Sequence, residues 1–199
     1  REAHAAGKPA LMQRRVAKAQ RAEHTLHVAA PRGHDRIDFV VGRLDVDDTA
    51  DLIRHAHQSG WATPASTVAL GGSSGGLTVL GVLADHPGLV AGGVASYPVS
   101  DLESLTESTH RFEAHYTDTL VAPDDGSPES EAAFRALSPI HRANRITEPL
   151  LLMHGREDPV VPIEQSETLV ARIRESGGEV DFVVYEGEGH GFREPDNVA

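Results

Sequence analysis

The spacing of apolar positions changes several times along the chain after residue 45. Apolar or β-branched runs of about four to eight residues, bounded by glycine, proline or charged residues, are typical of buried strands. Runs of this form lie at 67–70, 90–97, 150–153 and 181–185. Stretches with helical spacing, or with small apolar residues throughout, lie between them at 49–60, 77–84 and 164–176. Strands that alternate with helices predict an α/β fold around a parallel sheet.

Capping and turn signals mark the ends of these elements. Three aspartates within residues 45–48 precede the helix predicted at 49–60, and we expect one of them to cap its N-terminus. The helix predicted at 164–176 runs into two glycines, which is typical of a helix C-terminus. The segment 101–140 is polar, and Pro-Asp-Asp-Gly at 123–126 predicts a loop within it.

Composition and charge exclude several classes of protein. The chain has 199 residues, with 18 Lys and Arg against 30 Asp and Glu, so its formal net charge is −12. We therefore expect one main domain that binds neither nucleic acid nor an anionic membrane surface. No apolar stretch approaches the ~20 residues that a membrane-spanning helix needs. The absence of cysteine excludes disulfides, thiolate metal ligands and a cysteine nucleophile.

The N-terminal segment differs from the rest of the chain. It is basic and alanine-rich, and it contains no apolar core of a signal peptide. We expect residues 1–41 to be an atypical segment and residues 42–199 to be the functional domain. Because the sequence starts at Arg1, we also expect a fragment truncated at both ends.

A Gly-Gly-Ser-Ser-Gly-Gly sequence at 71–76 follows the first predicted strand and precedes a predicted helix. A strand, a Gly-x-Ser-x-Gly turn and a helix form the nucleophile elbow, which projects a serine hydroxyl above the sheet. Two registers fit the motif. We choose Ser73 over Ser74 because Ser73 lies where the strand should turn. The alternative is a glycine-rich turn with incidental serines.

A serine hydroxyl needs a base and an orienting carboxylate, which follow the elbow in the order acid, then histidine. Asp158 lies in the loop after the strand predicted at 150–153, and His190 lies in the loop after the strand predicted at 181–185. Both loops leave the carboxyl ends of strands, where open α/β sheets hold their sites. The alternatives are a surface carboxylate and a solvated histidine.

These motifs resemble the catalytic domain of prolyl oligopeptidase family serine peptidases, in its acylaminoacyl-peptidase and dipeptidyl-aminopeptidase branch. The resemblance covers about residues 42–197. It is carried by the segments at 42–48, 71–76, 96–102, 109–113, 138–140, 149–158 and 186–192.

The resemblance implies an α/β-hydrolase fold with a mostly parallel sheet flanked by helices. It also implies Ser73 as nucleophile, His190 as base, Asp158 as the residue that orients His190, and the Ser74 backbone N–H as an oxyanion donor. We expect a serine peptidase that hydrolyses short peptides in the cytoplasm without a cofactor. Its partner would be the peptide substrate.

The sequence departs from the family in several respects, and one of them in particular keeps alternatives open. The His-Gly-Gly loop, which helps form the oxyanion hole in this family, has no counterpart in residues 1–41. Loss of one oxyanion donor costs roughly 10²–10³ in rate. The alternatives are therefore a carboxylesterase acting on small esters and a non-catalytic remnant.

The chain contains 12 histidines, which raises the question of a metal site. The nearest pairs are His24 with His27 and His55 with His57, and neither has a third ligand at a recognisable spacing. We therefore expect scattered exposed histidines and no metal.

Overall fold

The computed structural model describes residues 42–109 and 127–198. Its strands are β1 (Ala69–Gly72), β2 (Gly93–Ser96), β3 (Leu150–Gly155) and β4 (Val180–Tyr185). Its α-helices are α2 (Leu44–Gln58), α3 (Ser74–Asp85), α4 (Leu102–Thr109), α6 (Pro128–Leu137), α7 (Ile163–Glu175) and α8 (Pro195–Val198). Two 3₁₀ helices complete it, η1 (Pro64–Ser66) and η2 (Pro139–Arg145). Within the described residues, no helix is both long and apolar enough to cross a membrane.

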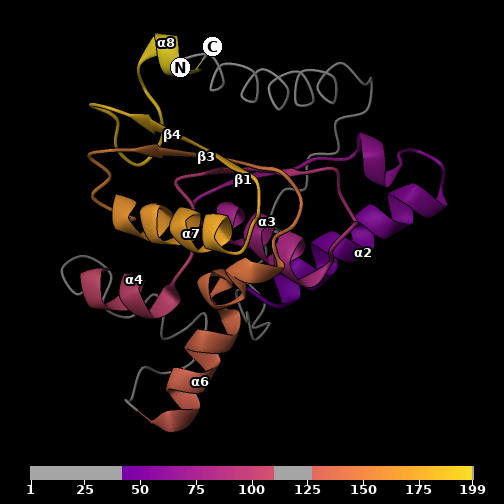
Figure 1. Cartoon of the computed structure of the whole chain (residues 1–199), viewed down its shortest axis with the longest axis horizontal. Coiled ribbons are helices and arrows are strands. Elements are labelled where there is room, and N and C mark those ends of the chain that lie inside the picture. The colour runs from indigo at the N-terminus through magenta and orange to yellow at the C-terminus, as the bar shows by residue number, and fades with distance from the viewer. Residues whose placement is uncertain (1–41, 110–126, 199) are drawn as a thin grey trace, which may run out of the picture.

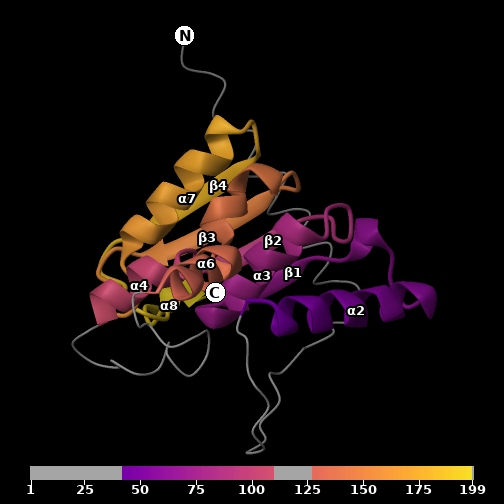
Figure 2. The same cartoon turned by 90° about the horizontal axis from the view of Figure 1, so that it is seen from below.

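The strands form one sheet in the order β1-β2-β3-β4, and every neighbouring pair is parallel. Figure 2 shows them side by side, with α2 beyond the β1 edge. Because all four strands run the same way, the loops that follow β1, β3 and β4 leave the sheet at one end. That arrangement puts segments far apart in the sequence beside one another.

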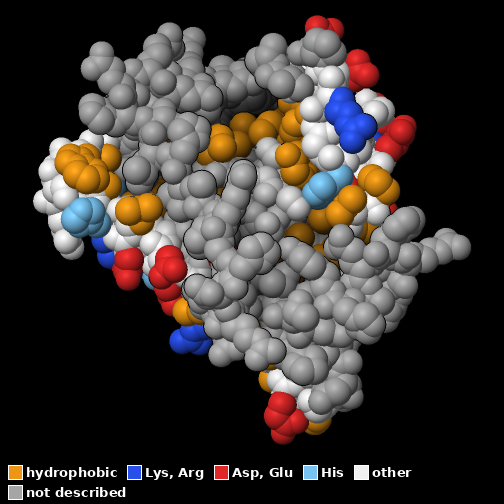
Figure 3. Space-filling view, turned by 180° about the vertical axis from the view of Figure 1, so that it is seen from behind, with side chains coloured by type: hydrophobic (Ala, Val, Ile, Leu, Met, Phe, Trp, Pro, Cys, Tyr) orange, Lys and Arg blue, Asp and Glu red, His pale blue; other side chains and the backbone are white. Residues whose placement is uncertain are grey.

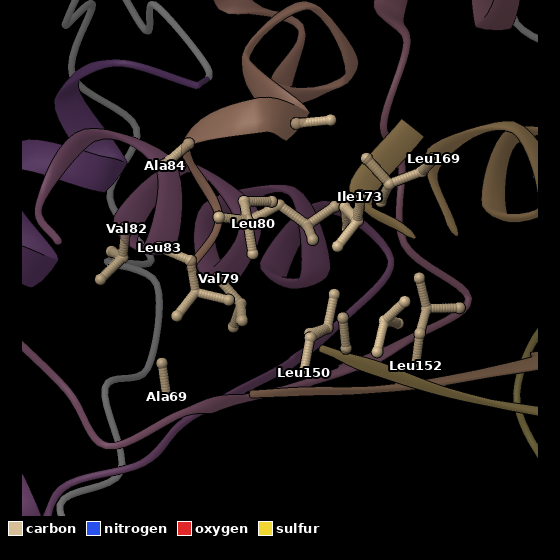
Figure 4. Close-up of a cluster of buried hydrophobic side chains, with 14 of the residues drawn as sticks. Ala69, Val79, Leu80, Val82, Leu83, Ala84, Leu150, Leu152, Leu169 and Ile173 are labelled. Carbon is tan, nitrogen blue, oxygen red and sulfur yellow. The ribbon is translucent and has the colours of Figure 1, made fainter. Parts of the chain in front are cut away.

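Helices α3 and α7 cover one face of the sheet, α3 over β1 and β2 and α7 over β3 and β4 (Figure 1). Buried and partly exposed positions alternate at the start of β3, so that Leu150 and Leu152 point to this face. They meet Leu80 and Leu83 of α3, together with residues of α7 (Figure 4). The four leucines are almost completely buried, and this layer fixes the sheet against the helices.

Not all apolar side chains of the strands are buried. Figure 3, which views the molecule from behind relative to Figure 1, shows hydrophobic side chains of the described residues among polar ones. On β1 the alternation is clear, since Ala69 is buried whereas Leu70 is 69% exposed. Of the described helices, α3 and α7 make the main contacts with the sheet.

The structure confirms the parallel α/β arrangement and corrects one detail of a helix start. Helix α2 begins at Leu44, ahead of the aspartates expected to cap it, and no side chain caps its N-terminus. Asp45 instead lies in the first turn, where it accepts hydrogen bonds from the Gly42 N–H (2.6 Å) and the Thr78 hydroxyl (2.5 Å). It therefore ties α2 to α3. The loop predicted at 123–126 lies outside the described residues.

The polar segment 101–140 contains helices rather than loop alone. Its start is fixed to α7 by Gln165, which is buried and accepts hydrogen bonds from the Ser100 and Asp101 N–H groups at 2.9 and 3.1 Å. The Ser100 hydroxyl donates to the Gln165 carbonyl in return. This clamp holds the chain where it leaves β2, beside the carboxyl ends of β1 and β3.

Candidate active site

The turn between β1 and α3 is tight and strained. Ser73 sits there with φ 55° and ψ −123°, a backbone conformation that a residue with a side chain adopts only when its surroundings enforce it. A Cβ built on Gly71 would lie 2.3 Å from the Gly75 carbonyl oxygen. Strand and helix can approach this closely only because residue 71 is glycine. The result is a serine hydroxyl that projects from the turn.

Ser73, Asp158 and His190 meet at the carboxyl ends of β1, β3 and β4. The Ser73 hydroxyl lies 2.9 Å from Nε2 of His190, and Nδ1 of His190 lies 2.8 Å from Oδ2 of Asp158. A carboxylate only accepts hydrogen bonds, so Nδ1 carries the hydrogen and Nε2 of the neutral ring accepts from the hydroxyl. The Asp158 side chain is fully buried and that of His190 is 21% exposed.

The Asp158 carboxylate is held on both oxygens. Oδ1 accepts the backbone N–H groups of Val160 and Val161 at 2.8 and 2.9 Å, while Oδ2 faces the imidazoles of His190 and His154. Burial favours the neutral acid, but the hydrogen bonds from the two histidines and the two backbone groups outweigh it. Together they hold the pKa of Asp158 well below its usual range. The group is therefore a fixed negative charge beside His190.

The loop that carries His190 is held by a second buried carboxylate. Glu188 is 2% exposed and accepts hydrogen bonds from the Arg193 and Glu194 N–H groups and from the Asn197 amide. The Asn197 contact and the two backbone groups lower the pKa of Glu188 against the effect of burial. The Glu188 carbonyl also accepts the Glu157 N–H at 2.9 Å, which joins this loop to the one that carries Asp158.

Aromatic rings pack beside the imidazole. Tyr97 follows β2 with φ 38°, and its ring centroid lies 4.7 Å from that of His190. Phe192 packs against Tyr97 at 5.3 Å and against Tyr185 at 4.7 Å. A methyl group on Gly72 would lie 3.1 Å from the Tyr97 ring. Tyr97 therefore fills the space between the serine turn and the His190 loop.

The structure thus brings three of the four residues singled out in the sequence into one chain of hydrogen bonds. Ser74, the fourth, is the first residue of α3, where a backbone N–H has no carbonyl one turn earlier to bind.

No metal site accompanies these residues in the part of the chain that the structure describes. His57 contacts the Thr67 hydroxyl at 2.9 Å and His55 packs on Trp61, so the two rings serve different neighbours. The other pair, His24 and His27, lies outside the described residues.

Sequence reasoning missed Tyr97, Glu188 and His154 as parts of this site. Glu188 and His154 stand within four residues of a predicted site residue, which is the one local signal that the sequence offers. That spacing does not reveal that Glu188 is a buried carboxylate, because burial and hydrogen-bond partners come only from the structure. The contact of Tyr97 depends on the order of the strands.

Comparison with known proteins identifies the family of this chain. A family model described as "Prolyl oligopeptidase family" matches residues 33–199. Dipeptidyl aminopeptidase BIII of Pseudoxanthomonas mexicana is 32% identical over 154 residues, which are 76% of this chain and 22% of that protein. The acylamino-acid-releasing enzyme of Arabidopsis thaliana is 31% identical over 160 residues, with 78% and 21% covered.

Solved structures give the same result. A puromycin-hydrolyzing peptidase of Mycobacterium tuberculosis matches with a TM-score of 0.74 and 34% identity, over 79% of this chain and 24% of that one. The chain spans about a fifth of the length of the curated relatives it matches. Because the family model covers most of the sequence, the α/β-hydrolase fold expected above is confirmed, and the chain belongs to the prolyl oligopeptidase family of peptidases.

Proposed function

We propose that residues 42–199 form the catalytic part of a serine peptidase, with residues 1–41 as a separate segment. Ser73 would act as nucleophile, His190 as general base and acid, and Asp158 as the group that orients His190. The observation that carries this proposal is the hydroxyl–imidazole–carboxylate chain, with its distances of 2.9 and 2.8 Å.

The proposed reaction is acyl transfer in two steps. As the Ser73 oxygen attacks the scissile carbonyl carbon, its proton passes to Nε2 of His190, and the negative charge of Asp158 stabilises the imidazolium that forms. The proton then goes to the leaving amine as the C–N bond breaks, which leaves an acyl group on Ser73. A water molecule attacks that ester while His190 takes its proton, and Ser73 regains a hydrogen as the acid departs.

The tetrahedral intermediate needs donors for its oxyanion. The Ser74 N–H is suited to this role because it lies at the N-terminus of α3, a 12-residue helix, where unpaired N–H groups and the helix dipole favour negative charge. It is adjacent to the nucleophile, so the donor and the attacking oxygen move together.

Short peptides are the proposed substrates. The names of the relatives describe enzymes that release dipeptides or acylamino acids or hydrolyse puromycin, which supports cleavage of amide bonds in small molecules. A carboxylesterase would use the same hydroxyl, imidazole and carboxylate. The ratio of the rates on matched amide and ester substrates distinguishes the two functions.

Labelling with a fluorophosphonate, followed by intact-mass measurement, tests the proposal. We expect one label per chain in the wild type and in Ser74→Ala, and none in Ser73→Ala. Far-UV circular dichroism on the same samples establishes that each variant is folded. A folded wild-type chain that takes no label, or a label that persists in Ser73→Ala, would overturn the proposal.

A further inference from the structure

A histidine that the proposed reaction does not use lies directly behind the site. His154 is the fifth residue of β3 and is completely buried. Its ring points to the same face of the sheet as Leu150 and Leu152, toward the first turn of α7. It fills the space between the strand end, the Asp158 loop and the helix. Burial of a polar ring is costly unless its nitrogens are both satisfied.

The neighbours of His154 determine which nitrogen carries the hydrogen. Nε2 lies 2.9 Å from the Val161 carbonyl oxygen, which can only accept, so Nε2 donates. Nδ1 lies 2.7 Å from the Ser166 hydroxyl, which is also completely buried. In the neutral ring Nδ1 has a lone pair, and the Ser166 hydroxyl donates to it. The ring is therefore held in the Nε2–H form.

The same Nε2–H group faces the carboxylate of the site. It lies 3.4 Å from Oδ2 of Asp158, the oxygen that accepts the hydrogen of His190 Nδ1 at 2.8 Å. Two imidazoles thus approach one carboxylate oxygen. His190, the nearer, is proposed to react, and His154, the farther, is held in place by Val161 and Ser166. The Val161 N–H binds Oδ1 while its carbonyl binds His154, so one peptide segment connects both sides.

We propose that His154 is a positioning residue, which fixes the Asp158 carboxylate for His190 and is itself fixed by Ser166. The proposal rests on the proposed function for its catalytic consequence, although the contact itself does not. Without the Nε2–H group, the Val161 carbonyl loses its donor and Oδ2 gains freedom to turn away from His190. A small displacement of this kind lowers the rate without removing any reacting group.

The test compares His154→Leu, which removes both polar contacts, with His154→Gln, whose amide can still donate toward Val161 and Asp158. One readout is the deshielded proton NMR signal of His190 Nδ1–H, measured in the Ser73→Ala background so that it needs no activity. The other is the rate of fluorophosphonate labelling with Ser73 intact. We expect His154→Leu to shift or remove the NMR signal and to slow labelling about tenfold. His154→Gln should restore most of both.

Leu152→Ala is the matched control, because Leu152 is equally buried two residues away on the same face of β3. It should destabilise the fold yet leave the NMR signal and the labelling rate of the folded fraction unchanged. Equal losses in His154→Leu and Leu152→Ala would overturn the proposal, as would an unaltered NMR signal in His154→Leu.

A nitrogen-15 spectrum of the wild-type chain decides the matter if His154→Leu fails to fold. We expect His154 as a single Nε2–H tautomer, and Ser166→Ala should move its Nδ1 resonance. An Nδ1–H tautomer would overturn the proposal, because Nε2 would then have no hydrogen to donate toward Val161 and Asp158. Absence of labelling in the folded wild type would instead overturn the proposed function, because the NMR readouts do not depend on Ser73.

Discussion

The two sides of the site are built by different physical means. On the serine side, the turn from β1 to α3 has a strained Ser73 and a glycine in near-contact with the backbone of α3. On the acid–base side, Asp158 and Glu188 are buried carboxylates that each accept at least three hydrogen bonds. The first side depends on the absence of side-chain volume, and the second depends on the pairing of buried polar groups.

This difference indicates how each side should respond to substitution. Where two backbone segments approach closely, an added methyl group is not tolerated, whereas charge has little influence. A buried carboxylate is poorly replaced by an amide of equal size, because the hydrogen-bond donors and acceptors no longer match. Variants that alter only volume or only polarity therefore distinguish the contributions of the serine side and the acid–base side.

Asp158→Asn changes polarity with almost no change in volume and should have the largest effect on reaction rate. The amide would present hydrogens to Nδ1 of His190, which favours the wrong tautomer of the ring. We expect labelling of Ser73 to slow by roughly 10³–10⁴. Stopped-time intact-mass measurements give the rate, and circular dichroism gives the folded fraction. A rate within tenfold of wild type in a folded variant would refute a role for this charge.

Gly71→Ala changes volume with no change in polarity. Its methyl group would lie 2.3 Å from the Gly75 carbonyl oxygen, so the turn must open. We expect a loss of about 2–4 kcal/mol in the free energy of unfolding and at least a hundredfold slower labelling. Urea denaturation measures the first quantity and intact mass the second.

Gly75→Ala is the control for Gly71→Ala. A methyl group at Gly75 meets no atom within 4 Å, and alanine favours the helix that begins at Ser74. Its unfolding free energy should equal or exceed that of the wild type. If both alanine variants were equally stable, close packing would not be what holds the serine side.

Glu188→Gln tests the acid–base side at a position away from the reacting atoms. Its amide cannot accept from the Arg193 and Glu194 N–H groups and the Asn197 amide as the carboxylate does, so we expect about 2 kcal/mol of destabilisation. The control is Glu186→Gln, since the Glu186 side chain is 74% exposed and its ion pair with Arg156 is superficial. A control loss as large as that of Glu188→Gln would contradict the comparison.

A fall in pH should gradually reduce the stability that the acid–base side confers. The pKa values of Asp158 and Glu188 lie below their usual range in the folded chain, so the unfolded chain binds more protons as pH falls. The stability they confer is therefore present above about pH 4–5 and is lost as pH falls further. Urea midpoints between neutral and acid pH should drop less steeply in Asp158→Asn than in the wild type. An identical dependence of the urea midpoint on pH in both proteins would show that the pKa of Asp158 is not lowered in the folded chain.

Much of the serine side could be predicted from the sequence because its information is local. The strand, the glycines and the helix that form the turn occupy consecutive residues at 69–85, and the register that favours Ser73 follows from where the strand ends. Asp158 and His190 were also within reach, because both follow predicted strands and parallel strands end together.

The parts that could not be predicted depend on contacts between distant segments. The Tyr97 ring reaches His190 only because β2 lies between β1 and β3 in the sheet. His154 looks like an ordinary strand residue, and Glu188 like an ordinary loop residue, until the partners that bury them are known. The prediction of an aspartate cap was wrong for a similar reason, since Asp45 accepts hydrogen bonds from Thr78 on another helix and from the preceding Gly42 N–H, and not from an N–H group within its own helix.

The long sequence separation within the site has a consequence for the time course of folding. The Ser73–His190 hydrogen bond joins residues 117 positions apart, whereas the His190–Asp158 bond spans 32. Closing the larger loop costs more chain entropy and needs β1, β2, β3 and β4 in place together. Nucleophile reactivity should therefore be among the last properties to return during refolding, after helical signal has recovered. The time at which the serine regains its reactivity therefore reports when the sheet is complete.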